Sequence, residues 1–137
     1  MIGTPDQDAF VSKNKWAVVT TVRKDGSPSS SVIFYVRDGD EILFSTMKSR
    51  VKAKSLLRDP RIAVAVLDEG APYGFVTIEG TGRVIDGDTT EEHKRIYKTF
   101  RGADYVAPAD LAEQLARDGR VIVRVTAERV SGVPNRG

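Results

Sequence analysis

The stretch Phe44-Ser-Thr-Met-Lys-Ser-Arg-Val-Lys-Ala-Lys-Ser-Leu-Leu-Arg-Asp-Pro-Arg61 joins a hydrophobic strand to a helix rich in lysine and arginine. The strand ends in small hydroxyl residues, and Asp59-Pro60 ends the helix because proline cannot continue it. A helix N-terminus presents free backbone N–H groups, and hydroxyls and cations beside it add further donors. The stretch therefore predicts a site for a phosphate or another anion.

The same basic stretch has a second interpretation, an ordinary solvent-exposed charged helix. We expect the helix to begin near Ser49 and to pack Leu56 and Leu57 against the rest of the protein. Arg50 and Lys52 would then flank this apolar face at the N-terminal end. Cations there oppose the helix dipole, which indicates that a ligand compensates for them. From the residues alone, the two interpretations carry equal weight.

Apolar and β-branched segments on both sides of the stretch predict an antiparallel sheet. The expected strands are 16–22, 29–36, 41–46, 62–67, 73–85 with bends at Gly80 and Gly82, and 121–126 continuing towards Val130. The turns between the first three are too short for crossover helices. Helices are expected at 5–11, at 90–101 and from Pro108 to just before Gly119. The sequence thus predicts one mainly β domain over residues 1–137, a six-stranded antiparallel β-barrel with flanking helices.

The composition narrows the function classes. The 137-residue chain contains no cysteine, which rules out disulfides, thiolate nucleophiles and cysteine-ligated metals. Its formal net charge of +2 does not by itself indicate a nucleic-acid partner. No apolar run reaches the roughly 18 residues of a membrane span, and residues 1–6 do not resemble a signal peptide. We therefore expect a cytoplasmic protein with no nucleic-acid partner and no membrane span.

Few side chains have the pattern of a catalytic or metal site. His93 is the only histidine, and we interpret it mainly as a packed or capping residue of a helix. The acidic residues lie scattered in turns without metal-ligand spacing, and P-loop and nucleophile-elbow motifs are missing. No residue is predicted to be catalytic or to bind a metal. This favours chemistry carried by a bound organic cofactor.

Two further pairs of residues are candidate ligand contacts. Ser29 and Ser31 share one face of an otherwise apolar strand, and they either face solvent or line a pocket. Tyr73 and Phe75 are either core residues or a stacking platform for a flat ring. The residues alone leave both alternatives open.

The order of several motifs resembles that of a known family. These motifs are Arg23-Lys-Asp-Gly-Ser-Pro28, Val32-Ile-Phe-Tyr35, Leu43-Phe-Ser-Thr46, the basic stretch from Ser49 to Arg61, and Val76-Thr-Ile-Glu-Gly-Thr-Gly-Arg-Val84. Together they are similar to the pyridoxamine 5′-phosphate oxidase-like flavin-binding split barrels, in particular the branch that uses the deazaflavin coenzyme F420. The resemblance runs from about Phe10 to Gly132. It implies a split β-barrel homodimer with cofactors at the subunit interface.

The resemblance also implies the residues of the cofactor site. The implied contacts are Ser29, Ser31, Val32, Ser45, Thr46, Met47, Ser49, Arg50, Lys52, Tyr73 and Phe75. Arg50 and Lys52 would bind the phosphate and acidic tail of the cofactor, and the last two residues would come from the other subunit. FMN-binding members typically carry an Arg and a Lys in the second strand, and residues 29–34 contain no cation. This departure favours F420, with FMN as the alternative.

The implied activity is hydride transfer between the deazaflavin and an unsaturated or conjugated small molecule. An FMN- or tetrapyrrole-binding split barrel and a non-catalytic F420 carrier are the alternatives. Residues 131–137 contain Arg136 as their only basic residue. True pyridoxamine phosphate oxidases carry basic substrate residues near the C-terminus, so we do not assign that activity.

Overall fold

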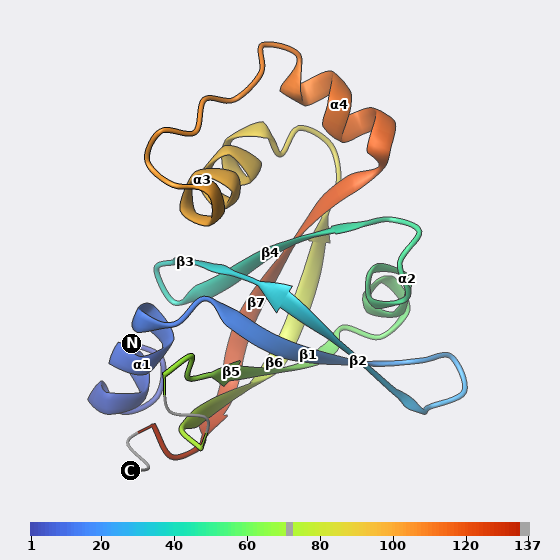
Figure 1. The fold of residues 1–137 in the computed structure, drawn as a ribbon. Coiled ribbons are helices and arrows are strands. Elements are labelled where there is room, and N and C mark those ends of the chain that lie inside the picture. The colour runs from blue at the N-terminus through green and yellow to red at the C-terminus, as the bar shows by residue number, and fades with distance from the viewer. Residues whose placement is uncertain (71–72, 135–137) are drawn as a thin grey trace.

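The computed structural model describes residues 1–70 and 73–134, and its centre is one curled antiparallel sheet (Figure 1). The strand order is β2-β1-β5-β6-β7-β4-β3. The strands are β1 (Trp16–Val22), β2 (Pro28–Phe34), β3 (Val36–Asp38), β4 (Glu41–Met47), β5 (Arg61–Leu67), β6 (Phe75–Ile85) and β7 (Arg120–Ser131). The helices are α1 (Pro5–Lys13), α2 (Val51–Arg58), α3 (Thr90–Arg101) and α4 (Leu111–Asp118).

The sheet is split where the chain passes from β2 to β3. β2 pairs with β1 whereas β3 pairs with β4, so two consecutive strands lie at opposite edges of the sheet. The buried Tyr35 lies at this break, and its hydroxyl donates a hydrogen bond of 2.7 Å to the main-chain oxygen of Val11. The mainly β split-barrel prediction is confirmed. The single strand predicted over 29–36 is wrong, because the chain changes pairing partner at Tyr35, which makes seven described strands rather than six.

Alternating residues of the strands form the core. In β1 and β5 every second side chain is buried, as the two-residue repeat of a strand requires. The apolar ones among these side chains join Phe44 of β4 in one cluster, to which α1 contributes Phe10 and α2 contributes Leu56. The two helices therefore close the curled sheet at separate places (Figure 1).

A β-bulge between Glu79 and Gly80 bends the long strand β6. A Cβ atom at Gly80 would overlap the main-chain oxygen of Thr126 on β7, so only glycine permits this approach of the two strands. The bend that the sequence predicts at Gly80 therefore corresponds to a close backbone contact.

Three helix boundaries differ from the predictions, and the first is the end of α1, which extends to Lys13 rather than residue 11. α2 begins at Val51 with Arg50 as its N-cap, and α4 begins at Leu111, three residues after Pro108. Leu57 is 71% exposed although we expected it to pack, because the face of α2 turned to the core ends at Leu56. The predicted C-cap of α4 is confirmed, since Gly119 adopts the left-handed conformation. No helix among the described residues is long and apolar enough to cross a membrane.

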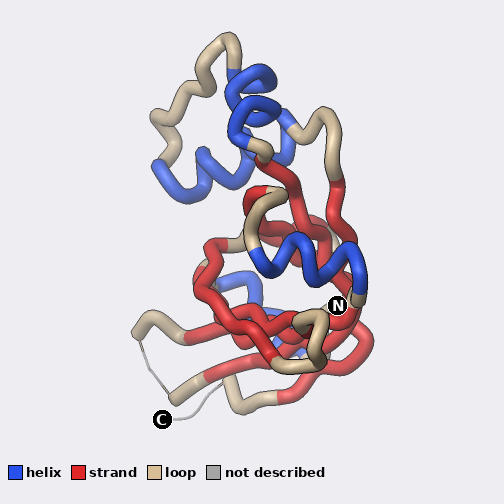
Figure 2. The backbone as a smooth tube through the Cα atoms, turned by 90° about the vertical axis from the view of Figure 1, so that its right-hand side faces the viewer, coloured by secondary structure: helices blue, strands red, loops and turns tan. Residues whose placement is uncertain are grey.

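α3 and α4 lie together beyond one end of the sheet (Figure 2). β6 leads into α3, and α4 leads directly into β7. Ile96 of α3 belongs to a second, smaller apolar cluster with Val36, Leu43 and Ile122. This cluster seats α3 against the β3–β4–β7 part of the sheet, which positions the helix as one wall of a cleft.

Candidate functional site

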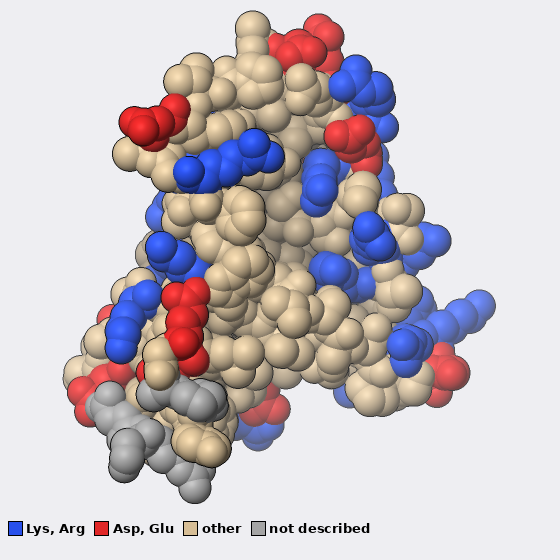
Figure 3. All heavy atoms as spheres, viewed as in Figure 1, with Lys and Arg blue, Asp and Glu red and all other residues tan. Residues whose placement is uncertain are grey.

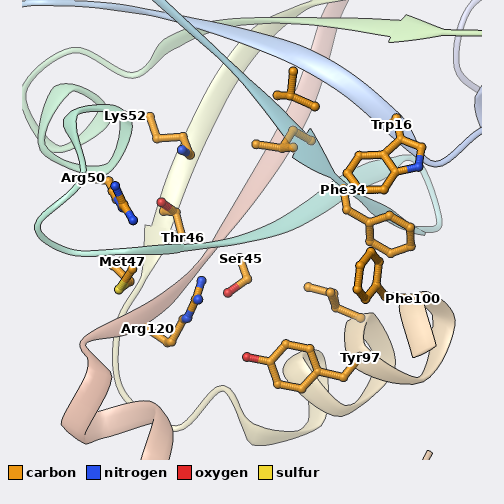
Figure 4. A pocket seen from close by; sticks show the side chains of 13 residues that line it. Trp16, Phe34, Ser45, Thr46, Met47, Arg50, Lys52, Tyr97, Phe100 and Arg120 are labelled. Carbon is orange, nitrogen blue, oxygen red and sulfur yellow. The ribbon is translucent and has the colours of Figure 1, made fainter.

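A cleft of about 390 Å³ lies between the end of β4, the start of α2 and one face of α3. Its size falls in the range of sites for small organic molecules. The lining residues come from six elements and the turn before α2 (Figure 4). They are Trp16, Val32, Ile33, Phe34, Ser45, Thr46, Met47, Arg50, Lys52, Ile96, Tyr97, Phe100 and Arg120.

One end of the cleft is cationic. Arg50, Lys52 and Arg120 point towards one another there (Figure 4), and Lys and Arg side chains gather beside a hollow on this face of the molecule (Figure 3). None of the three forms an ion pair within the described ranges 1–70 and 73–134. By contrast, the nearby Lys48 pairs with Asp86 at 2.8 Å. The cleft therefore collects positive charge without an acidic partner from the described chain.

The electrostatics of Lys52 show the consequence. Burial lowers the pKa of this ammonium group, and the positive charges of Arg50 and Arg120 lower it further. Both effects disfavour the charged form, and an anion bound between the three cations would oppose them. This geometry favours the anion-site interpretation for the N-terminal end of the basic stretch. Lys54 and Arg58 lie outside the cleft and fit the surface interpretation.

The other end of the cleft is aromatic. Trp16, Phe34 and Phe100 meet edge to face. Their ring centroids are 5.2 Å apart for Trp16 and Phe34, 6.0 Å for Trp16 and Phe100, and 5.1 Å for Phe34 and Phe100. Phe100 is 55% exposed despite this contact. A partly exposed aromatic wall suits a flat apolar ligand, because rings can stack or pack edge-on against it.

Ser45, Thr46 and Met47 connect the two ends along the last residues of β4. Their position follows from the pairing of β4 with β7, in which Met47 lies opposite Arg120. The Ser45 hydroxyl also lies 2.7 Å from Nε2 of the buried His93. The cleft thus joins a cationic end, a polar floor and an aromatic wall, which suits a ligand with a flat ring and an anionic extension.

Comparison with known proteins identifies the family. The family model for pyridoxamine 5′-phosphate oxidase matches residues 4–134, nearly the whole chain. This chain belongs to the pyridoxamine 5′-phosphate oxidase family. Membership confirms the family resemblance of the sequence and supports a flavin-type cofactor.

Three solved structures show the same fold as this family member. An F420 reductase is 23% identical with a TM-score of 0.73, and the match covers 90% of this chain and 94% of that one. An FAD-binding protein from Mesorhizobium loti is 18% identical with a TM-score of 0.68, covering 96% and 94%. A heme-binding protein from Mycobacterium smegmatis is 18% identical with a TM-score of 0.71, covering 96% of this chain and 54% of that one. Solved proteins with this fold thus include ones named for F420, FAD and heme.

In this pyridoxamine 5′-phosphate oxidase family member, the cleft brings together part of the predicted site. The predicted residues that line it are Val32, Ser45, Thr46, Met47, Arg50 and Lys52. Ser49 lies exposed in the turn before α2, outside the cleft lining. Its predicted role stays a prediction.

Four predicted contacts lie elsewhere in the single chain. Ser29 and Ser31 lie earlier along β2 than Val32, and neither lines the cleft. Phe75 is the first residue of β6 and Tyr73 lies in the turn just before it, whereas the other end of the strand leads to α3 and the cleft. The described chain does not bring these four residues into its cleft. The contacts that the sequence assigned to them stay predictions.

The structure adds residues that the sequence analysis did not assign to the site. They are Trp16, Ile33, Phe34, Ile96, Tyr97, Phe100 and Arg120. Ile96, Tyr97 and Phe100 share one face of the helix expected at 90–101 by their spacing, but nothing local indicated that this face forms a cleft wall. Arg120 carried only one usable signal, its position at the start of a strand just after a helix C-cap.

Proposed function

We propose that this chain is an F420-dependent oxidoreductase, a homodimer that transfers a hydride between the deazaflavin and an unsaturated or conjugated small molecule. One observation carries the proposal. The cleft joins an aromatic wall to three cations that have no ion-pair partner among the described residues. F420 likewise joins a flat ring to a long anionic tail. β2 offers no cation for the compact phosphate of FMN, which supports F420 over FMN.

The residues of the cleft would divide the work of binding. Arg50, Lys52 and Arg120 would hold the phosphate and the acidic tail, and Ser45 with Met47 would contact the ring. F420, when bound, supplies a hydride at C5 of its ring. The protein would orient the substrate beside the ring and exclude water, and the wall of Trp16, Phe34 and Phe100 is suited to that role.

A titration with each cofactor tests the choice between F420 and FMN. Trp16 is the only tryptophan of the chain and lines the cleft, so its fluorescence reports on ligand binding. We expect F420 to quench this fluorescence at much lower concentration than FMN does. Trp16→Phe serves as the control that removes the signal. Micromolar FMN binding without a response to F420 would overturn the proposal and favour the FMN-binding alternative.

Turnover separates an enzyme from a carrier. Protein loaded with reduced F420 should transfer its reducing equivalents to at least one member of a broad panel of enones and quinones. The return of the oxidised-cofactor absorbance measures this transfer. Complete inactivity across the panel, with tight F420 binding, would instead support the non-catalytic carrier.

A second subunit would complete the site. Tyr73 is 74% exposed next to the start of β6, which supports a contact with a partner or ligand. Light scattering should therefore give about twice the chain mass of 15.0 kDa. Tyr73→Ala should weaken F420 binding by about threefold to tenfold, the loss of one aromatic contact. A monomer whose F420 affinity is unchanged by Tyr73→Ala would contradict the shared site.

A further inference from the structure

The buried His93 links the cleft to the interior of the protein. Its side chain is 0% exposed, and its Nε2 lies 2.7 Å from the Oγ of Ser45, which lines the cleft. Its other ring nitrogen, Nδ1, lies 3.0 Å from the main-chain oxygen of Thr89 and 3.0 Å from the Thr89 hydroxyl. Both nitrogens of the imidazole therefore have partners, and the one facing the cleft meets a residue of the binding site.

These contacts determine where the protons lie. A main-chain carbonyl can only accept a hydrogen bond, so Nδ1 of the neutral imidazole carries the proton and donates it to Thr89. Nε2 is then an acceptor, and the Ser45 hydroxyl must donate to it. Because a serine hydroxyl has one proton, Ser45 retains only lone pairs for a ligand in the cleft.

We infer that Ser45, positioned by His93, is a specificity-determining residue that offers the ligand a hydrogen-bond acceptor and selects a ring edge bearing an N–H or O–H donor. Protonation of His93 reverses this polarity. Nε2 would then donate to Ser45, and the serine proton would be free to point into the cleft. The inference relies on the proposed function only for the identity of the ligand used to test it.

The surroundings of His93 favour its neutral form. Burial lowers the pKa of the imidazole most strongly, and the positive charge of Arg120 on β7 lowers it further. The hydrogen bond to Thr89 and the negative charge of Glu92 on α3 raise it. The pKa of His93 is nevertheless lowered overall. Tyr97 packs beside the ring, with centroids 5.7 Å apart, and β4 contributes the Ser45 hydroxyl. The acceptor state therefore holds at neutral pH, and the reversal requires a pH below the ordinary value of about 6.5.

NMR of the ligand-free protein tests the assignment directly. His93 is the only histidine, so one imidazole gives all the histidine ring signals. We expect the Nδ1–H tautomer at pH 7.5 and titration below pH 6.5. Ser45→Ala should move both the Nε2 resonance and the titration midpoint. An Nε2–H tautomer in the wild-type protein would overturn the inference, whether or not any cofactor binds.

Binding measurements test the effect on the ligand, with F420 and FMN as the probes. We compare how far the affinity for each probe that binds falls between pH 7.5 and pH 5.5. In the wild-type protein this fall should be about fivefold to tenfold larger than in His93→Gln, the range expected for one reversed hydrogen bond. Glutamine retains an acceptor for Ser45 but does not titrate, so this variant should keep most of the affinity at pH 7.5. Ser45→Ala should be weaker at pH 7.5 and should share the flatter pH profile.

Two results keep this inference separate from the proposed function. Equal pH profiles in the wild-type protein, His93→Gln and Ser45→Ala would overturn the inference even if F420 binds tightly. Failure of both probes to bind would overturn the proposed cofactor, and the tautomer of His93 would then decide the inference alone. Thermal unfolding shows whether each variant is folded. If His93→Gln does not fold, the pH profile of Ser45→Ala still provides the comparison with the wild-type protein.

Discussion

Replacing Arg50 and Lys52 together with alanine should weaken F420 binding by at least about tenfold, and adding Arg120→Ala should weaken it further. Each charge-assisted hydrogen bond contributes about 1.5–3 kcal/mol, and the three cations line the same end of the cleft. Arg50 also repels the Lys52 ammonium group and lowers its pKa. Because the two side chains interact, the loss of affinity in the double variant should differ from the sum of the losses in the two single variants. Isothermal titration calorimetry at fixed ionic strength measures the affinities.

A matched variant separates local contacts from net charge. Lys48→Ala with Lys54→Ala also removes two positive charges, as many as the Arg50 and Lys52 substitutions do, but neither lysine lines the cleft. The exposed ion pair of Lys48 with Asp86 contributes little to stability, so the variant should fold normally. We expect its F420 affinity to stay within about twofold of the wild-type value at 0.15 M salt, where distant charges are screened. Equal losses in the two variants would show that only overall charge matters.

Gly80→Ala should lower the free energy of unfolding by about 3 kcal/mol or more, the upper range for overpacking in a rigid environment. The added methyl group would overlap the main-chain oxygen of Thr126, and the neighbouring backbone of Glu128 is also close. Relief would require β6 and β7 to separate at the bulge. Urea unfolding followed by circular dichroism measures the loss.

Gly70→Ala is the control for this substitution. Among the described residues, the nearest atom to a Cβ at Gly70 would be an Asp68 side-chain oxygen at 3.5 Å, an ordinary contact, and the Gly70 backbone does not have a positive φ. Its free energy of unfolding should therefore change by less than about 1 kcal/mol. If Gly80→Ala were equally mild, the close approach of β6 and β7 could not be what requires glycine.

Local features of the fold were readable from the sequence because neighbouring residues determine them. The capping box of α1 is an example: Thr4 Oγ1 accepts from the Gln7 N–H at 3.2 Å, and Gln7 Oε1 accepts from the Thr4 N–H at 2.9 Å. The left-handed Gly119 that ends α4 is a similar case. The break at Tyr35 was missed because both halves of 29–36 have strand propensity, and only their partners distinguish them.

The candidate site likewise has features that the sequence predicts and features that only the tertiary structure decides. The sequence by itself determined a basic helix start after a hydroxyl-bearing strand end, and hence a candidate anion site at Arg50 and Lys52, because these residues are adjacent in the chain. Only the tertiary structure brought Arg120 opposite Met47 and placed the hydroxyl of Ser45 against His93, 48 positions away. Strand register and helix packing make such contacts between distant segments, and no local pattern specifies them.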